Sequence, residues 1–138
     1  MSDQQPLSLP ELRKFVSSIP FNELLGIRLV RAHKDGVTIE CNLRDELLNA
    51  SGVLHGGVTA TMADVAVGIA ITHQLGRPRA ATTIEMKLNY LRPVIHGKIV
   101  ARAKLLRVGQ TVCCGSVSLY DSAKQLVGSA LVTYMLLK

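Results

Sequence analysis

The segment from Gly57 to about Leu75 constrains the fold of this chain more than any other. Apolar side chains occupy nearly all of its positions, so no polar face remains, and a helix that is apolar all round is buried. The run Gly76-Arg77-Pro78 then forms a clear stop signal. The length is borderline for a membrane span, but Asp64 stands in the middle and no second segment of this kind follows. We therefore expect the buried central helix of a protein with no membrane partner.

Most of the remaining chain alternates apolar and polar residues, which is typical of strands with one buried face. Asp35 and Gly36 predict a hairpin between the first two strands, and Gly109-Gln110 predicts another tight turn. The predicted strands span residues 27–33, 37–43, 81–91, 98–108, 111–120 and 125–137, with a loop at 44–54. Within 81–91 the predicted apolar face consists of Ile84, Met86, Leu88 and Tyr90. Because the helix is the only large apolar partner for a sheet, the expected fold class is α+β: an antiparallel sheet of five to six strands wrapped around a long central helix.

The first part of the chain carries helix signals. Ser8 and Glu11 form a capping-box pattern that opens a short helix, which should stop before Pro20. Residues 21–26 are expected to form a short turn, and both an irregular and a helical turn fit the sequence. The length suits one core rather than two, so we interpret residues 1–138 as a single domain with residues 1–20 as an N-terminal helical extension.

Charge and composition narrow the function. The net charge of +6 favours anionic ligands, although the basic residues are scattered and also fit ordinary solvated strand faces. With two Phe, three Tyr and no Trp, the chain lacks aromatic platforms for nucleic-acid bases, so we expect no nucleic-acid partner. Three cysteines without a spaced Cys/His pattern predict reduced packing cysteines and no metal site. The first five residues lack the basic and apolar regions of a signal peptide, and the expected location is the cytoplasm.

Asp64 is the most informative single residue. It is the only acidic residue on the predicted helix, and no residue of opposite charge lies within a turn of it. An ionised carboxylate in such surroundings is costly unless it is hydrogen-bonded or reached by water. Two interpretations stay open at this point: a carboxylate tied to backbone donors or a lysine for structural reasons, or a catalytic base or nucleophile in a half-dry pocket.

His55, Gly56 and Gly57 stand where the predicted helix begins. The first N–H groups of a helix have no internal partners and carry the positive end of the dipole, which makes this a natural oxyanion site. Asp64 lies seven residues beyond Gly57, roughly 10 Å further along the helix, whereas reacting groups must approach to about 3 Å. If both groups are catalytic, they must come from different chains. Two antiparallel helices across a symmetric dimer interface would pair them.

Other catalytic patterns are absent from the sequence. It contains no Gly-x-Ser-x-Gly, no P-loop and no dinucleotide-binding fingerprint. Asp64 and His73 would point about 180° apart around the helix, so they cannot share a metal ion. His33 and His96 have no partner at ligand spacing and are interpreted as surface or loop residues.

The run Asn49-Ala50-Ser51-Gly52-Val53-Leu54-His55-Gly56-Gly57, followed by Met62-Ala63-Asp64, resembles the signature of hotdog-fold thioesterases of the phenylacetate-degradation (PaaI-type) branch. Residues 83–93 on a strand, residues 107–111 at a hairpin and a final apolar strand match in the same order, so the resemblance covers about residues 20–138. It implies a hotdog-fold acyl-CoA thioesterase, active as a homodimer and often as a dimer of dimers. It implies no cofactor, with CoA entering only as part of the small-molecule acyl-CoA substrate.

The resemblance also implies roles for individual residues. The N–H of Gly56 would polarise the thioester carbonyl, and Asp64 from the partner chain would activate water or attack directly. Asn49 and His55 would orient the thioester and the departing thiolate, and Thr83 would orient the water. The residues that would contact the acyl group or CoA are Gly57, Val53, Leu54, Met62, Tyr90, Leu91, Arg92, Pro93, Arg107, Val108, Gly109, Gln110 and Thr111. Gln110 stands where a basic residue is common in the family, and Thr83 where serine is common.

Two other functions compete with thioester hydrolysis. One is a non-catalytic hotdog protein that binds acyl-CoA, and the other is a hotdog dehydratase or hydratase. The presence of Asp64, Asn49 and His55 argues against the first, since binding alone needs no buried base. The order His-Gly-Gly followed by Asp resembles the hydrolases rather than the dehydratases. The identity of the acyl group stays open, because its pocket would be lined from two chains.

Overall fold

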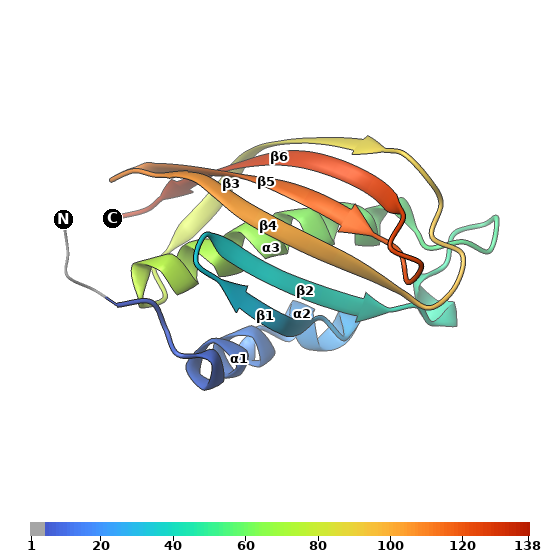
Figure 1. Cartoon of the computed structure of the whole chain (residues 1–138), viewed down its shortest axis with the longest axis horizontal. Coiled ribbons are helices and arrows are strands. Elements are labelled where there is room, and N and C mark those ends of the chain that lie inside the picture. The colour runs from blue at the N-terminus through green and yellow to red at the C-terminus, as the bar shows by residue number, and fades with distance from the viewer. Residues whose placement is uncertain (1–4) are drawn as a thin grey trace.

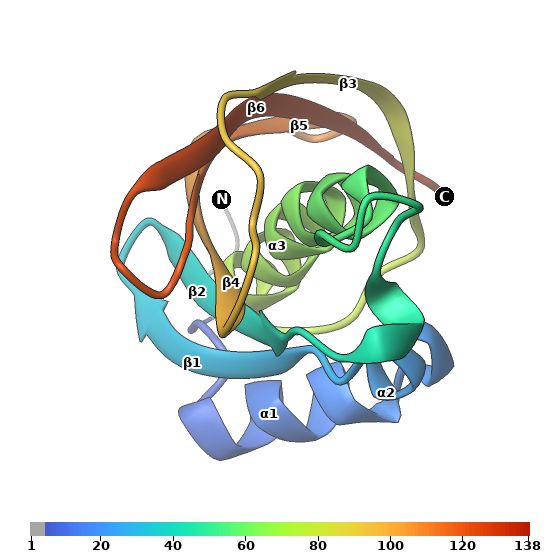
Figure 2. The same ribbon diagram turned by 90° about the vertical axis from the view of Figure 1, so that its right-hand side faces the viewer.

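The computed structural model describes residues 5–138, and the start of the predicted N-terminal extension, residues 1–4, lies outside the described residues. Its elements in chain order are α1 (Leu9–Ser18), α2 (Pro20–Leu25), β1 (Arg28–His33), β2 (Gly36–Asn42), the 3-10 helix η1 (Asp45–Leu47), α3 (Gly56–Leu75), β3 (Ala81–Tyr90), β4 (Lys98–Val108), β5 (Val112–Tyr120) and β6 (Leu126–Leu136). The six strands form one antiparallel sheet in the order β1-β2-β4-β5-β6-β3, which curls around α3 (Figures 1 and 2). The predicted α+β architecture is therefore confirmed, with six strands.

The central helix is buried, as its composition predicts. Met62, Ala63, Ala66 and Val67 have no exposed surface and pack against inward-facing residues of the sheet. By length and composition alone, α3 could cross a membrane, yet 61% of its most apolar stretch is covered by the rest of the protein. That degree of burial is typical of a core helix.

The N-terminal helices confirm the predicted cap. Ser8 caps α1 as predicted: its Oγ accepts the N–H of Glu11 at 3.3 Å, and its own N–H donates to the Glu11 carboxylate at 2.9 Å. Of the two forms left open for residues 21–26, the structure has the helical one, the helix α2, because Pro20 suits the first position of a helix. Gly26, at φ 76°, ends α2 in the left-handed conformation that a glycine adopts without strain.

Strand β3 lies at an edge of the sheet. It pairs with β6 on one side, and its other edge has no strand partner within residues 5–138. The register shifts between Thr83 and Glu85, so Ile84 lies in a bulge and the strict alternation predicted for this strand is interrupted. Ile84 and Tyr90, both expected on the buried face, are 52% and 57% exposed. The strand therefore offers an open backbone edge and exposed apolar side chains.

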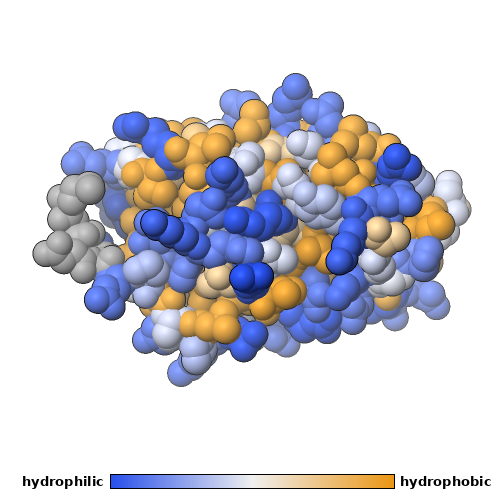
Figure 3. All heavy atoms as spheres, viewed as in Figure 1, coloured by the Kyte–Doolittle hydropathy of each residue, from blue (hydrophilic) through white to orange (hydrophobic). Residues whose placement is uncertain are grey.

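The outer surface is mixed. Apolar and hydrophilic patches alternate over the face shown in Figure 3. Exposed large apolar side chains on β4, β5 and β6 include Leu106, Val112 and Leu131. The three cysteines are free: Cys41 and Cys113 are buried and Cys114 is half-buried.

Candidate active site

Asp64 lies in the middle of α3 and is half-buried. Its Oδ1 accepts two hydrogen bonds, from Thr83 Oγ1 at 2.7 Å and from Tyr134 Oη at 2.7 Å. The Tyr134 hydroxyl also lies 2.8 Å from the backbone carbonyl of Asp64. Among the described residues, Oδ2 of Asp64 has no hydrogen-bond partner. One oxygen of the carboxylate is thus held by protein donors, while the other stays available to water or substrate.

The sheet register brings the two donors to Asp64. Thr83 on β3 and Tyr134 on β6 are directly opposite each other in the antiparallel pair. Burial of the phenol, reinforced by the nearby Asp64 carboxylate, raises the pKa of Tyr134 above its usual value. Tyr134 therefore remains protonated at neutral pH and acts as a donor to Asp64.

Gly68, one turn after Asp64, makes room for this tyrosine. A Cβ at position 68 would lie 2.8 Å from Tyr134 Oη and 3.3 Å from its Cζ. Any side chain there would push the phenol away from its place beside Asp64. The glycine is needed for a close approach between helix and strand.

The N-terminus of α3 forms the second part of the candidate site. His55 is the N-cap, and its Nδ1 accepts the N–H of Gly57 at 2.8 Å. The neutral ring therefore carries its proton on Nε2. Val58 N–H donates to the His55 carbonyl at 2.9 Å, whereas the N–H of Gly56 has no acceptor within the described part of the chain. Gly56 therefore has the free helix-terminal donor that an oxyanion site requires.

Tyr90 holds the same helix terminus from the sheet. Its hydroxyl donates to the Gly56 carbonyl at 2.7 Å. Its ring lies so close that a Cβ on Gly56 would be 3.3 Å from Tyr90 Cε1. In the single chain, this predicted CoA-contacting residue supports the peptide next to the free N–H.

The loop before α3 is ordered by Asn49. Its Oδ1 accepts the N–H groups of Ser51 at 2.9 Å and Val53 at 3.2 Å. Within one chain, Asn49 therefore shapes the loop that leads to His55. Its side-chain nitrogen has no hydrogen-bond partner among the residues described, so it stays free for the predicted contact with substrate.

The predicted acyl-contacting side chains differ in accessibility. Val53 is half-buried, while Leu54 is 5% exposed and Met62 is fully buried in the core. Leu54 and Met62 therefore offer almost no surface to a ligand in the single chain. Their side chains face the interior, where both help to hold α3 and the preceding loop in place.

The two predicted CoA-contacting segments lie at opposite ends of the sheet. Tyr90, Leu91, Arg92 and Pro93 are exposed and follow the end of β3, where Tyr90 pairs with Gly128. The segment formed by Arg107, Val108, Gly109, Gln110 and Thr111 is the β4–β5 hairpin. It lies at the same end of the sheet as the start of β3, with β6 between them, because Val112 and Thr82 both pair with Met135. One chain does not bring these segments together.

The predicted catalytic residues likewise divide into two groups. Asp64 and Thr83 lie together at the start of β3, with Tyr134 as the third member. Gly56, His55 and Asn49 lie at the other end, next to Tyr90. Eight residues of α3 separate Asp64 from Gly56, which corresponds to about 12 Å along its axis.

Sequence reasoning missed Tyr134 and Gly68. Helical spacing indicates only those partners of Asp64 that lie on the helix itself, whereas both hydrogen-bonding partners come from the sheet. A tyrosine in the last apolar strand carries a weak signal, since such a residue is usually only part of the core. The described residues include no group of three His, Cys, Asp or Glu side chains arranged to hold a metal ion.

Comparison with known proteins identifies the family. Residues 51–127, more than half of the chain, match the thioesterase superfamily, so the chain belongs to that superfamily. The fold is the hotdog fold, as predicted, and the prediction of a thioester hydrolase is confirmed at this level. The membership does not by itself distinguish branches within the superfamily.

Individual relatives and solved structures cover most of the chain. The medium/long-chain acyl-CoA thioesterase YigI of Salmonella typhimurium is 32% identical over 136 residues and covers 88% of each protein. Acyl-coenzyme A thioesterase 13 of Pongo abelii is 35% identical over 106 residues, 75% of this chain and 74% of that protein. The zebra fish thioesterase superfamily member 2 has a TM-score of 0.84 at 25% identity, over 94% of this chain and 99% of that one. A Haemophilus influenzae thioesterase has a TM-score of 0.87 at 22% identity, over 98% and 94% of the chains, and shows the same fold.

Proposed function

We propose that this protein hydrolyses acyl-CoA thioesters to a free acid and CoA, with Asp64 as general base or nucleophile. The observation that carries the proposal is the hydrogen bonding of the Asp64 carboxylate. Two hydroxyl donors hold Oδ1, and Oδ2 is free on an otherwise apolar helix. Such an arrangement fixes the carboxylate and leaves one oxygen to accept a proton from water or to attack a carbonyl carbon.

The rest of the reaction requires a donor for the carbonyl oxygen and a route for the leaving group. The Gly56 N–H would stabilise the oxyanion that forms when water or the carboxylate adds to the thioester carbon. Collapse of that intermediate breaks the C–S bond and releases CoA as a thiolate, which takes up the proton that the attacking water loses. If Asp64 attacks directly, the product of this step is an acyl–Asp64 anhydride, and a water molecule then hydrolyses it to the free acid and restores the carboxylate. His55, whose Nδ1 accepts a hydrogen bond, would orient the departing sulfur through its Nε2–H. Asn49 would position the thioester through its side-chain nitrogen.

The separation of the two groups within one chain supports a site shared by two chains. About 12 Å along α3 is too far for one carbonyl to contact both Asp64 and Gly56. The open edge of β3 offers a way to join two chains. If two β3 strands pair antiparallel across a twofold axis, the Thr83 end of one lies beside the Tyr90 end of the other. We propose a homodimer of this kind, with a dimer of dimers as the larger form.

The same pairing would unite the two predicted CoA-contacting segments. The β4–β5 hairpin lies at the same end of the sheet as Thr83 of its own β3, and residues 90–95 follow the Tyr90 end. Across the twofold axis they would therefore approach each other from different chains. Arg92 and Arg107, both exposed, would then attract the phosphate groups of CoA.

The finer features of the assignment rest on the sequence. The PaaI-type branch is proposed from the signature around residues 49–64, while the relatives named above include medium/long-chain and other acyl-CoA thioesterases. A cytoplasmic location, the absence of a cofactor, and the absence of nucleic-acid or membrane partners are proposed on the grounds given for the sequence. Residues 1–138 are proposed to act as one domain.

A turnover assay on purified protein tests the proposal against its two competitors. Hydrolysis of phenylacetyl-CoA or palmitoyl-CoA should release free thiol in step with free acid. A protein that only binds acyl-CoA would show saturable binding without thiol release. A dehydratase would instead convert a 3-hydroxyacyl-CoA to the enoyl-CoA without releasing thiol. Either of the last two results would contradict hydrolysis as the function.

A further inference from the structure

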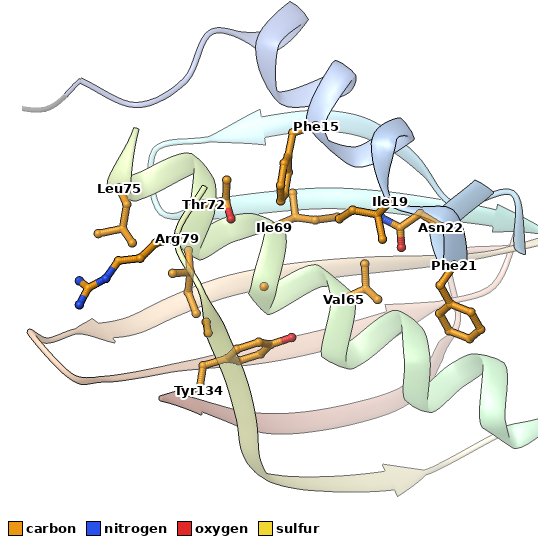
Figure 4. A pocket seen from close by; sticks show the side chains of 13 residues that line it. Phe15, Ile19, Phe21, Asn22, Val65, Ile69, Thr72, Leu75, Arg79 and Tyr134 are labelled. Carbon is orange, nitrogen blue, oxygen red and sulfur yellow. The ribbon is translucent and has the colours of Figure 1, made fainter. Parts of the chain in front are cut away.

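A cavity of about 280 Å³ lies between α3, the start of β3 and the N-terminal helices (Figure 4). Helix α3 forms its floor over residues 65–75, a length of about 15 Å. The side chains that line it are mostly apolar, among them Phe15, Ile19, Val65, Ile69 and Leu75. An elongated apolar cavity of this kind suits a chain of methylene groups.

The cavity begins beside the catalytic carboxylate. Tyr134 forms part of its wall, and the hydroxyl of the same side chain is 2.7 Å from Asp64 Oδ1 (Figure 4). Val65, the next residue after Asp64, and Gly68 also line this end. A thioester carbon held at Asp64 would therefore have the cavity directly next to it.

Few polar side chains line the cavity: Asn22, Thr72, Arg79 and Tyr134. The side-chain nitrogen of Asn22 donates to the Val16 carbonyl at 3.0 Å, which ties α2 to α1. Arg79 is exposed and lies near Leu75, at the end of the cavity away from Asp64. Between Tyr134 and Arg79, no lining residue carries a charge. The interior would therefore disfavour acyl groups with charged substituents.

We propose that this cavity binds the acyl chain and that residues of the N-terminal helices set its preferred length; this rests on the proposed hydrolysis of acyl-CoA. The substrate class is uncharged, unbranched acyl groups long enough to run along residues 65–75 of α3, a path of about 15 Å.

The N-terminal helices are fixed firmly enough to act as a wall. Leu12 and Val16 are 0% and 2% exposed, so α1 is anchored in the core. Phe15 and Ile19, on the same helix or just after it, then face the cavity from a rigid position. Their side chains, together with Leu75, determine how far an acyl chain can extend.

Two substitutions with opposite effects test the proposal. Leu75→Trp fills the far end of the cavity, and Phe15→Ala enlarges it. We expect Leu75→Trp to lower the ratio of kcat/KM for decanoyl-CoA to that for butanoyl-CoA at least tenfold, because each buried methylene contributes about fourfold to binding. Phe15→Ala should raise the ratio for hexadecanoyl-CoA to decanoyl-CoA. Leu24→Trp, on an exposed residue of α2 outside the cavity, is the matched control and should change neither ratio.

A binding measurement separates this proposal from the proposed hydrolysis. Calorimetry with a decanoyl thioether analogue of CoA, compared with CoA alone, reports the contribution of the acyl chain without turnover. Leu75→Trp should remove most of that contribution while its thermal midpoint stays near that of the parent protein. If both variants keep the parental chain-length ratios and the analogue binds Leu75→Trp as tightly as before, the acyl chain lies elsewhere. If the analogue behaves as expected but no thioester is cleaved, the proposed hydrolysis is wrong and the cavity assignment stands.

Discussion

The side chains around Asp64 show how a carboxylate is kept on an apolar helix. The sequence suggested a charge without partners, because no residue within a turn of the helix could pair with it. The sheet instead supplies two hydroxyl donors, Thr83 and Tyr134, to the same carboxylate oxygen. The carboxylate is thus fixed by neutral donors rather than by a positive charge.

Replacing Asp64 by asparagine tests its chemical role. We expect Asp64→Asn to lower kcat about 10²-fold or more, because the amide cannot act as a base or nucleophile, while KM changes little. Since an amide oxygen can accept the same two hydrogen bonds, the thermal midpoint should stay close to that of the parent protein. Glu23→Gln, an equivalent change at an exposed position on α2, is the control and should have no effect. A folded Asp64→Asn protein with nearly normal kcat would rule out the mechanism.

Tyr134 is expected to position Asp64 through its hydroxyl, while its ring lines the proposed acyl cavity. Tyr134→Phe removes one of the two donors to Oδ1, so kcat should fall about tenfold, less than for Asp64→Asn. KM should change little, because phenylalanine keeps the ring that faces the cavity.

Gly68→Ala tests the same point without removing the hydroxyl. Its added methyl group would lie 2.8 Å from Tyr134 Oη and should displace it, so kcat should fall by a similar factor. Tyr120→Phe, which removes a tyrosine hydroxyl elsewhere in the sheet, should leave kcat and KM unchanged. A parental kcat in both Tyr134→Phe and Gly68→Ala would show that Tyr134 has only a packing role.

At the level of secondary-structure elements, helix α3 carries both of the groups to which the proposed mechanism gives the chemistry. Asp64 lies in its interior, where burial restricts water, and Gly56 lies at its start, where the N–H has no acceptor among residues 5–138. The two polar groups next to this N–H already have hydrogen-bond partners. His55 accepts the Gly57 N–H, and Tyr90 donates to the Gly56 carbonyl. They thereby leave one donor free and hold it in a fixed direction.

A matched pair of substitutions at Gly56 isolates this donor. Both Gly56→Ala and Gly56→Pro place a Cβ about 3.3 Å from the exposed Tyr90 ring, but only proline removes the N–H. Proline is compatible with the first position of a helix, so α3 should still form. We expect kcat for Gly56→Pro to fall about 10²-fold below that of Gly56→Ala, the range seen when an oxyanion donor is lost. Equal kcat values for the two variants would place the oxyanion donor elsewhere.

Prediction from sequence succeeded for elements with a strong periodic signal. The apolar run of α3, the Asp35-Gly36 turn and the alternation in β4, β5 and β6 each determine a local structure. The capping box at Ser8 and Glu11 was likewise predictable from two residues. Register was not predictable, because it depends on contacts between distant strands. Neither the bulge at Ile84 nor the pairing of Thr83 with Tyr134 follows from a local pattern, and so Tyr134 escaped notice.

At the level of the whole molecule, the two halves of the candidate site lie at opposite ends of β3, whose outer edge is open. The sequence signature predicted which residues act, and helix geometry predicted that one chain is not enough. What could not be deduced from the sequence is the surface through which two chains meet. It depends on which strand lies at the edge of the sheet, and strand order is a property of the complete fold.

Mixing two inactive variants tests the shared site. Chains carrying Asp64→Ala and chains carrying Gly56→Pro should each be nearly inactive alone. After subunit exchange, a hybrid dimer contains one site with both parental groups, so part of the activity should return. Mass spectrometry of differently tagged chains confirms the exchange. Hybrids that are present but inactive would argue against a site built from two chains.

The proposed construction of each site from two chains also has a genetic consequence. In a cell with one normal and one altered gene copy, a chain with a single defect still forms one working site in each hybrid, and about half of the activity should survive. A chain that carries both Asp64→Ala and Gly56→Pro would inactivate both sites of every hybrid, because each site takes one of the two groups from it. Activity should then fall to about a quarter, so two recessive lesions combined in one allele would become dominant.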